Sequence, residues 1–290
     1  MNRVSYNVLV GDCRETLRTL PNQCVNTVVT SPPYFGLRDY DNENQIGMEE
    51  TPEEFVQALV EVFREVRRVL RDDGTVWLNL GDSYAGSGKG RNSDGSPNVD
   101  GNSKQATSRG TTNGVLRKSK LHGDLKPKDL IGIPWMVAFA LRADGWYLRQ
   151  DIIWSKPNPM PESVQDRCTK SHEYIFLLSK SKSYYYDHEA IKSEGSNKRS
   201  VWNVVPKPFR EAHFATYPPE LIEPCILAGC PVGGTVLDPF GGSGTTVGVA
   251  YRNDRNSILC ELNPEYSKLV VSRIESIIKG KRTLGATLPL

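Results

Sequence analysis

The chain has 290 residues, of which 38% are hydrophobic and 24% are charged, and its formal net charge at pH 7 is +2. This composition excludes a disordered or fibrous protein, and no apolar run is long enough for a membrane span. Six cysteines and four histidines lack the spacing of a metal site, so we expect neither zinc nor disulfide bonds. The start of the chain has no signal-peptide pattern, and a cytoplasmic location is expected.

The first predicted strand covers residues 5–10 and ends in Gly11-Asp12. Leu17 and Leu20 follow at the spacing of a short helix. Asp12 is a suitable N-cap for that helix, because its carboxylate can accept a hydrogen bond from a backbone N–H of the first turn. A structural role is therefore one interpretation of Asp12.

A second strand is predicted over residues 25–30, where β-branched side chains dominate. Pro32 and Pro33 end it, because proline cannot donate a hydrogen bond to a neighbouring strand. The stiff turn holds the Ser31 hydroxyl and the turn carbonyls beside the flat face of Tyr34. Hydrogen-bond acceptors next to an aromatic ring suit a planar, amino-bearing ring that has left its own stack. A proline-terminated strand with a core tyrosine is the alternative.

Helices and strands alternate through the middle of the chain. A helix is expected to begin at the capping box Thr51-Pro52-Glu53-Glu54 and to end at Asp72-Asp73-Gly74. A further helix is expected within residues 128–143, where Pro134 is tolerated only in the first turn. Strands are expected over residues 75–80, 146–154 and 173–178. This alternation predicts an α/β fold.

Residues 84–128 differ in composition from the rest of the chain. They contain nine Lys or Arg against three Asp, which gives +6 and leaves −4 for the remainder. They also contain eight glycines and six serines and lack apolar periodicity. The composition fits a flexible, disordered insertion in solvent, and it also fits a basic flap on a phosphate backbone, where Lys and Arg displace counterions. The motifs at the two ends of the chain decide between them.

Residues 234–246 predict a short strand, a Gly-rich turn and the start of a helix. The glycines let the backbone come close to a ligand, and Asp238 at the strand end can accept hydrogen bonds from that ligand. A last strand over residues 256–261 ends in Glu261, about 20 residues after the turn, where nucleotide-binding α/β folds place an acid on ribose hydroxyls. An ordinary glutamate at a strand end is the alternative for Glu261.

The two motifs together resemble those of the DNA methyltransferases that methylate amino groups. The catalytic motif of that family, (Asp/Asn/Ser)-Pro-Pro-(Tyr/Phe), matches residues 31–34, and its S-adenosylmethionine motif, Asp-Pro-Phe-x-Gly-x-Gly-Thr-Thr, matches residues 238–246. The catalytic motif precedes the cofactor motif, which is the order of the circularly permuted β class. The resemblance extends over about residues 5–279.

The resemblance implies one catalytic domain over residues 1–290. Its fold would be α/β, a doubly wound, Rossmann-like methyltransferase sheet that is circularly permuted and carries inserted DNA-recognition segments. The permutation should place the strand at residues 5–10 beside a helix at residues 263–279, with the chain ends on one side of the sheet. In this setting DNA contact is the favoured interpretation of the basic segment 84–128.

The resemblance also implies roles for individual residues. The catalytic residues would be Ser31, Pro32, Pro33 and Tyr34. The residues that bind S-adenosylmethionine would be Asp12, Asp238, Phe240, Gly241, Ser243, Gly244, Thr245, Thr246 and Glu261. For Asp12 this role, with the carboxylate facing the adenine amino group, stands beside the N-cap interpretation.

Two further regions are expected to contact DNA. The Trp-x-Lys-x-Asn-x-x-Pro loop of the family matches Trp154 to Pro161, so Lys156 and Asn158 would bind nucleic acid, whereas Trp154 is expected to pack in the core. Residues 180–213 combine basic and aromatic side chains at the place of the target-recognition segment. The run Tyr184-Tyr185-Tyr186 within them is equally typical of a strand.

The implied activity is site-specific methylation of an exocyclic amino group on a base flipped out of double-stranded DNA. In this family Ser-Pro-Pro-Tyr usually accompanies cytosine N4, whereas Asp-Pro-Pro-Tyr and Asn-Pro-Pro-Tyr usually accompany adenine N6. We therefore predict cytosine N4, with adenine N6 and a catalytically inactive DNA-binding relative as alternatives. RNA, protein-glutamine and small-molecule methyltransferases are the other rivals. A cognate restriction endonuclease is a candidate partner, and a bacterial, archaeal or phage origin is expected.

Overall fold

A computed structural model describes residues 4–36, 44–85, 123–207 and 216–282 of the chain. Most of the basic segment 84–128 and part of the segment 180–213 therefore lie outside the described residues. None of the helices in the described part of the chain combines the length and the apolar character that crossing a membrane requires. All six cysteines are within the described residues and are free thiols.

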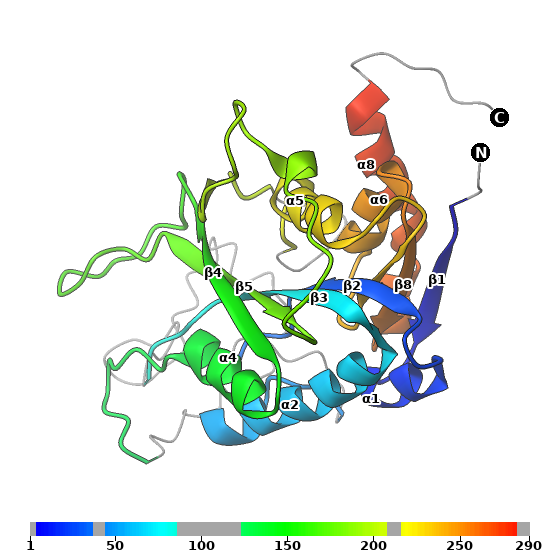
Figure 1. The fold of residues 1–290 in the computed structure, drawn as a ribbon. Helices are drawn as coiled ribbons and strands as arrows, with labels where there is room; N and C mark the ends of the chain where they lie inside the picture. Colours follow the sequence, from blue (N-terminus) through cyan, green and yellow to red (C-terminus); the bar gives the residue numbers. More distant parts are fainter. Residues whose placement is uncertain (1–3, 37–43, 86–122, 208–215, 283–290) are drawn as a thin grey trace.

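Within the described residues, eight strands form a sheet at the centre of the molecule (Figure 1). The strands are β1 (Tyr6–Val10), β2 (Val25–Thr30), β3 (Leu70–Leu80), β4 (Tyr147–Ser155), β5 (His172–Ser179), β6 (Val201–Asn203), β7 (Thr235–Asp238) and β8 (Asn256–Glu261). Their order across the sheet is β1-β8-β7-β2-β3-β5-β4-β6. Strand β5 is antiparallel to both neighbours, and all the other pairs are parallel.

Helices cover both faces of the sheet, so the predicted doubly wound α/β architecture is confirmed. The helices α1 (Cys13–Thr16), α2 (Pro52–Val69) and α4 (Ile133–Ala143) lie on one face, and α5 (Pro219–Gly229), α6 (Thr245–Arg252) and α8 (Val270–Arg282) lie on the other (Figure 1). The short elements are α7 (Pro264–Ser267) and two 3-10 turns, η1 (Leu17–Thr19) and η2 (Glu189–Ile191). Each layer buries its apolar side chains against the sheet in a separate cluster.

Helix α2 shows how the sequence pattern produces the packing. Thr51 accepts a hydrogen bond from the backbone N–H of Glu54, and the Glu54 side chain accepts one from the backbone of Thr51, which completes the predicted capping box. Phe55, Leu59 and Phe63 recur at a spacing of four residues and are fully buried. The helix therefore presents one continuous apolar face to the sheet.

The circular permutation is visible in the pairing of the first and last strands. Strand β1 pairs in parallel with β8, from Tyr6 opposite Ser257 to Val10 opposite Glu261. Helix α7, which follows β8, packs against β1. The strand at residues 5–10 thus lies beside the start of the 263–279 region, as the permutation predicts. The outermost residues, 1–3 and 283–290, lie outside the described part.

Several boundaries differ from the sequence-based expectation. Helix α2 ends at Val69, and β3 starts at once with Leu70, because Leu70 is extended, fully buried and paired with Val25. A register shift between Val25 and Thr27 then accommodates Asp72-Asp73-Gly74 inside the strand. Residues 184–186 form no strand, and the ring of Tyr186 stacks on Trp77 instead, with 6.1 Å between ring centroids.

The contact between α5 and the sheet generates a stability prediction. A Cβ atom on Gly229 would lie 2.6–2.7 Å from Thr27 Oγ1, Thr75 Oγ1 and Trp77 Nε1. We expect Gly229→Ala to lower the free energy of unfolding by about 1–3 kcal/mol, because the layers must separate to admit the methyl group. Denaturant unfolding measures the loss, with Gln57→Ala on the exposed face of α2 as control. Equal stability of the two variants would contradict this packing.

Candidate active site

The path of the chain creates a crevice between β2 and β7. From β2 the chain continues to β3 on one side, and from β7 it continues to β8 on the other. Such a reversal leaves an opening at the carboxyl ends of the strands, where open α/β sheets bind ligands. A cavity of ≈ 510 Å³ lies here and is lined by residues from both ends of the chain. Segments that lie far apart in the sequence therefore share one site.

The structure brings most of the predicted site residues into the wall of this cavity. They are Asp12, Ser31, Pro32, Pro33, Tyr34, Lys156, Phe240, Gly241, Ser243, Thr245 and Glu261. Asp238, Gly244 and Thr246 lie behind the wall, and Asn158 is exposed outside it. Trp154 is only 5% exposed and donates a hydrogen bond to the carbonyl of Val204, as expected of a core residue, although one part of it reaches the cavity.

A buried carboxylate connects the end of β2 to the Gly-rich turn that follows β7. The side chain of Asp238 accepts hydrogen bonds from Thr30 Oγ1 at 2.6 Å, Tyr217 Oη at 3.0 Å and the backbone N–H of Phe240 at 3.1 Å. Thr246 Oγ1 donates to it as well, at 2.5 Å. Burial raises the pKa of Asp238, and these hydrogen bonds act in the opposite direction. The carboxylate thus organises the site from behind instead of facing the cavity.

The Gly-rich turn approaches β8 more closely than any side chain would allow. A Cβ atom on Gly241 would lie 1.7 Å from Leu259 Cδ1, and Gly244 has a φ of +88°. The backbone N–H groups of Gly242 and Asn263 each donate to Glu261 at 2.8 Å, one to each carboxylate oxygen. Burial raises the pKa of Glu261. The turn therefore places an acceptor-rich, partly enclosed carboxylate in the cavity wall.

Two hydroxyl groups near this turn have no partner among the described residues. Ser243 Oγ and Thr216 Oγ1 are buried atoms without a hydrogen bond, and both residues line the cavity. Buried hydroxyls without partners are uncommon, and a bound polar ligand would satisfy them. Thr216 was missed by the sequence analysis, because no local pattern indicates that the approach to α5 borders the cavity.

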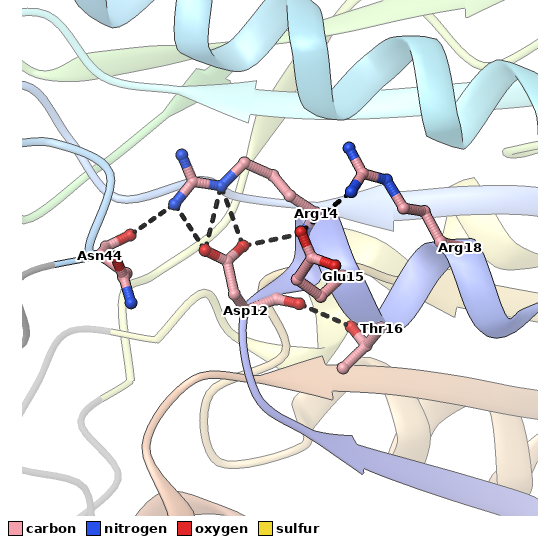
Figure 2. Close-up of polar contacts among 6 residues, drawn as sticks. All are labelled: Asp12, Arg14, Glu15, Thr16, Arg18 and Asn44. Carbon is pink, nitrogen blue, oxygen red and sulfur yellow. Dashed lines mark hydrogen bonds and ion pairs between the residues drawn. The ribbon is translucent and has the colours of Figure 1, made fainter.

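Asp12 forms the predicted N-cap and also anchors an arginine. Its carboxylate accepts a hydrogen bond from the backbone N–H of Arg14 at 2.8 Å, and the Arg14 guanidinium pairs with both carboxylate oxygens (Figure 2). Burial alone would raise the pKa of Asp12, but the hydrogen bonds from Arg14 outweigh it and hold the pKa below its ordinary value. Arg14 also donates to the carbonyl of Asn44 at 3.0 Å, so the pair connects the Gly-Asp turn to another part of the cavity wall.

The hydroxyl of Tyr34 faces a polar cluster of Glu173, Asn79 and Lys156, of which only Lys156 was predicted from the sequence as a site residue. It donates to Glu173 at 2.7 Å, and Asn79 donates to Glu173 at 3.3 Å. Lys156 forms an ion pair with the same carboxylate. Glu173 stands near the start of β5, and because β5 is antiparallel, its first residues lie at the edge where the parallel strands end. The antiparallel direction of β5 thus brings a carboxylate into the cavity wall.

Comparisons with known proteins identify the family of the chain. The family model described as DNA methylase matches residues 25–272. The chain belongs to this family. It is 51% identical to the Type II methyltransferase M.SmaI of Serratia marcescens over 94% of this chain and 92% of the relative. It is also 51% identical to the Type II methyltransferase M.Cfr9I of Citrobacter freundii, over 91% and 86% of the two chains.

Solved structures share the fold. A DNA modification methylase from Thermus thermophilus, in complex with S-adenosyl-L-methionine, superposes with a TM-score of 0.65 and 25% identity over 96% of this chain and 97% of that one. The PvuII DNA methyltransferase (cytosine-N4-specific) superposes with a TM-score of 0.69 over 97% and 94% of the two chains, and at 20% identity it supports the fold alone. The predictions of a DNA methyltransferase fold and of S-adenosylmethionine-dependent methylation of a base amino group are confirmed.

The cavity wall suits the cofactor of this family. The two hydroxyls without partners, the close glycine backbone and the Glu261 carboxylate are groups that a ligand with ribose hydroxyls and charged ends requires. When bound, S-adenosylmethionine supplies a methyl group activated by a sulfonium. The residues of the Gly-rich turn and Glu261 would hold it against the end of β7, next to the turn that carries Ser31.

The position of Asp238 leads to a prediction that separates two roles. We expect Asp238→Ala to lower the free energy of unfolding by about 1–3 kcal/mol or more, because it leaves buried donors without an acceptor. Affinity for S-adenosylmethionine should fall with it, since the Gly-rich turn loses its support. Denaturant unfolding and calorimetric titration measure the two quantities. Weaker binding at unchanged stability would instead indicate direct contact between Asp238 and the cofactor.

Proposed function

We propose that the enzyme methylates the N4 amino group of cytosine in double-stranded DNA, on a base that has rotated out of the duplex into the cavity. The observation that carries the proposal is the position of Ser31, whose neutral side chain lines the cavity directly after the carboxyl end of β2. The adenine N6 group is the alternative, because both bases present the same kind of amino group and Tyr34 can stack on either.

The catalytic turn accounts for activation of a weak nucleophile. The lone pair of the amino nitrogen is delocalised into the base, so the free amino group attacks poorly. The Ser31 hydroxyl oxygen and the Pro32 carbonyl would accept hydrogen bonds from its two protons, which draws the lone pair out of conjugation and directs it at the methyl group. The hydrogen bond from Thr30 to Asp238 fixes the last residue of β2, which directly precedes Ser31. No covalent enzyme intermediate is needed.

We further propose that Glu261 binds the ribose hydroxyls of the cofactor and that Phe240, Gly241, Ser243 and Thr245 form the wall around it. Each Glu261 oxygen accepts one backbone hydrogen bond and keeps a lone pair for the ligand. Gly244 and Thr246 would support this wall from behind. Contact of Asp12 with the adenine amino group stays a prediction beside its observed role as N-cap and partner of Arg14.

The DNA would lie across the open side of the cavity. We propose that the basic segment 84–128 contacts phosphates and that residues 180–213 read the target sequence. Asn158, on the exposed loop after β4, would also bind nucleic acid. Both M.SmaI and M.Cfr9I carry Type II names, so a cognate restriction endonuclease is the partner that we propose for this enzyme. A cytoplasmic location remains a prediction.

The modified base can be identified from the product. DNA from a methylation-free bacterial host that expresses the protein should yield N4-methylcytosine when it is digested to nucleosides and weighed by mass spectrometry. Mapping the modified positions along the genome would give the target sequence. N6-methyladenine as the sole product would overturn the cytosine assignment and leave the activation by Ser31 and Pro32 unchanged.

The catalytic turn can be tested by a single change. Ser31→Ala should reduce kcat by about a hundredfold or more, because it removes an interaction that acts on the amino group in the transition state. The Kd for S-adenosylmethionine should stay within about twofold of the unmodified enzyme, which calorimetry measures. A variant that retains most of its turnover would exclude the hydroxyl from the reaction.

The basic segment can be tested by its charge. Replacing Lys89, Arg91, Lys104 and Arg109 by Gln should weaken binding to all DNA sequences and reduce the slope of log affinity against log salt, by about 0.9 for each phosphate that the variant no longer neutralises. Fluorescence anisotropy at several salt concentrations measures both. A matched change of four exposed basic residues on the helical layers, Arg18, Arg64, Lys268 and Lys279, is the control. Equal slopes for the two variants would exclude phosphate contact by these four residues of the basic segment.

A further inference from the structure

We propose that Glu173 is a positioning residue that fixes the ring of Tyr34 for stacking on the target base. The proposal rests on the proposed entry of the base into the cavity. Glu173 has no part in the roles assigned above, yet its side chain is only 14% exposed and lines the cavity. A carboxylate with so little exposure requires partners that compensate its lost hydration.

Three groups hold the Glu173 carboxylate in place. The Lys156 ammonium pairs with Oε1, and the Asn79 side-chain amide donates to Oε2 at 3.3 Å. Asn79 is itself fixed by a hydrogen bond to the carbonyl of Tyr174 at 3.0 Å. Lys156 lies over the ring of Trp154, with its Nζ 4.3 Å from the ring centroid. The third group is the hydroxyl of Tyr34, so the other two give the carboxylate a defined position before any ligand binds.

The ring of Tyr34 is then held at its tip and along one edge. Its hydroxyl donates to Glu173 Oε2 at 2.7 Å, which is the distance of a strong, charge-assisted hydrogen bond. A Cβ atom on Gly81 would lie only 2.5 Å from Cε2 of Tyr34, so the ring packs directly against the backbone of Gly81. A tyrosine has two side-chain torsions, and these two contacts restrict both of them.

A preset ring plane matters because stacking contributes to catalysis only when the base is held in the attacking orientation. If the ring rotated freely, the entropy cost of ordering it would offset part of the free energy of stacking. The arrangement also gives Lys156 a role in the wall of the site. It balances the charge of Glu173, and contact of Lys156 with a DNA phosphate stays a prediction.

A double-mutant cycle tests the proposal. Tyr34→Phe and Glu173→Ala should each lower kcat by about tenfold, the usual scale for losing one charge-assisted hydrogen bond, with an unchanged Kd for S-adenosylmethionine. The double variant should also lose about tenfold, because both changes remove the same interaction. Glu173→Gln should recover most of the loss of Glu173→Ala, since its amide oxygen can still accept from Tyr34. Glu275→Ala, which removes an exposed Glu–Lys pair on α8, is the control.

Independent losses would overturn the proposal. A double variant about a hundredfold below the unmodified enzyme would show that Tyr34 and Glu173 act separately. Recovery of Glu173→Ala by the further change Lys156→Met would show that Glu173 acts only by balancing charge. If Glu173→Ala fails to fold, Gly81→Ala can replace it as the test variant, because it leaves every charge in place. The added methyl group should displace the ring of Tyr34 and lower kcat. A kcat equal to that of the unmodified enzyme would contradict the proposal.

A fluorescent base separates this proposal from the proposed function. Pyrrolocytosine at the mapped target position should brighten when the unmodified enzyme flips it, and the same flipping should occur with Tyr34→Phe at reduced kcat. No brightening and no N4-methylcytosine with the unmodified enzyme would reject the proposed function. Normal brightening and product together with independent losses in the cycle would reject only the role of Glu173.

Discussion

The buried carboxylate of Asp238 is the interaction on which the site depends. It stands at the end of β7 and collects hydrogen bonds from the end of β2, from the Gly-rich turn, from the start of α6 and from Tyr217 before α5. Strand β2, which leads into the proposed catalytic turn, and strand β7, which leads into the Gly-rich turn, are thereby held in one relative position. Because methyl transfer requires the donor and the acceptor in line, a rigid connection between the two strands is a requirement of the chemistry.

The sequence predicts those parts of the structure that depend on local chemistry. The capping box of α2, the proline-terminated β2 and the Gly-rich turn after β7 each have a composition that only one kind of backbone satisfies, and all three are found where expected. The resemblance to a known family predicts the arrangement of the sheet and the site shared by the two motifs. The ends of helices and strands are harder to predict. Strand β3 begins at Leu70 because a buried core position there requires an apolar side chain, and this tertiary requirement overrides the local sequence pattern.

The remaining features of the site depend on directions and depths that a sequence does not encode locally. Glu173 has the sequence context of an ordinary residue at a strand start, and only the reversed direction of β5 brings it beside Tyr34. Asp238 matches a binding motif, yet its depth behind the wall follows from the packing of four elements around it. Arg14 forms an ion pair with the carboxylate of Asp12, although nothing in their sequence spacing distinguishes this pair from many others on the surface of a helix.

The pairing of β1 with β8 has a consequence for how the chain is made. The backbone N–H of Ser5 donates to the side chain of Asn256, 251 residues away, so β1 has no partner strand until β8 has left the ribosome. Closing so long a loop carries an entropy cost that local contacts must first offset, and folds rich in such distant pairs form slowly. Strand β1 therefore stays unpaired until β8 has been synthesised, and the cavity wall, which contains Glu261 at the end of β8, is completed only then.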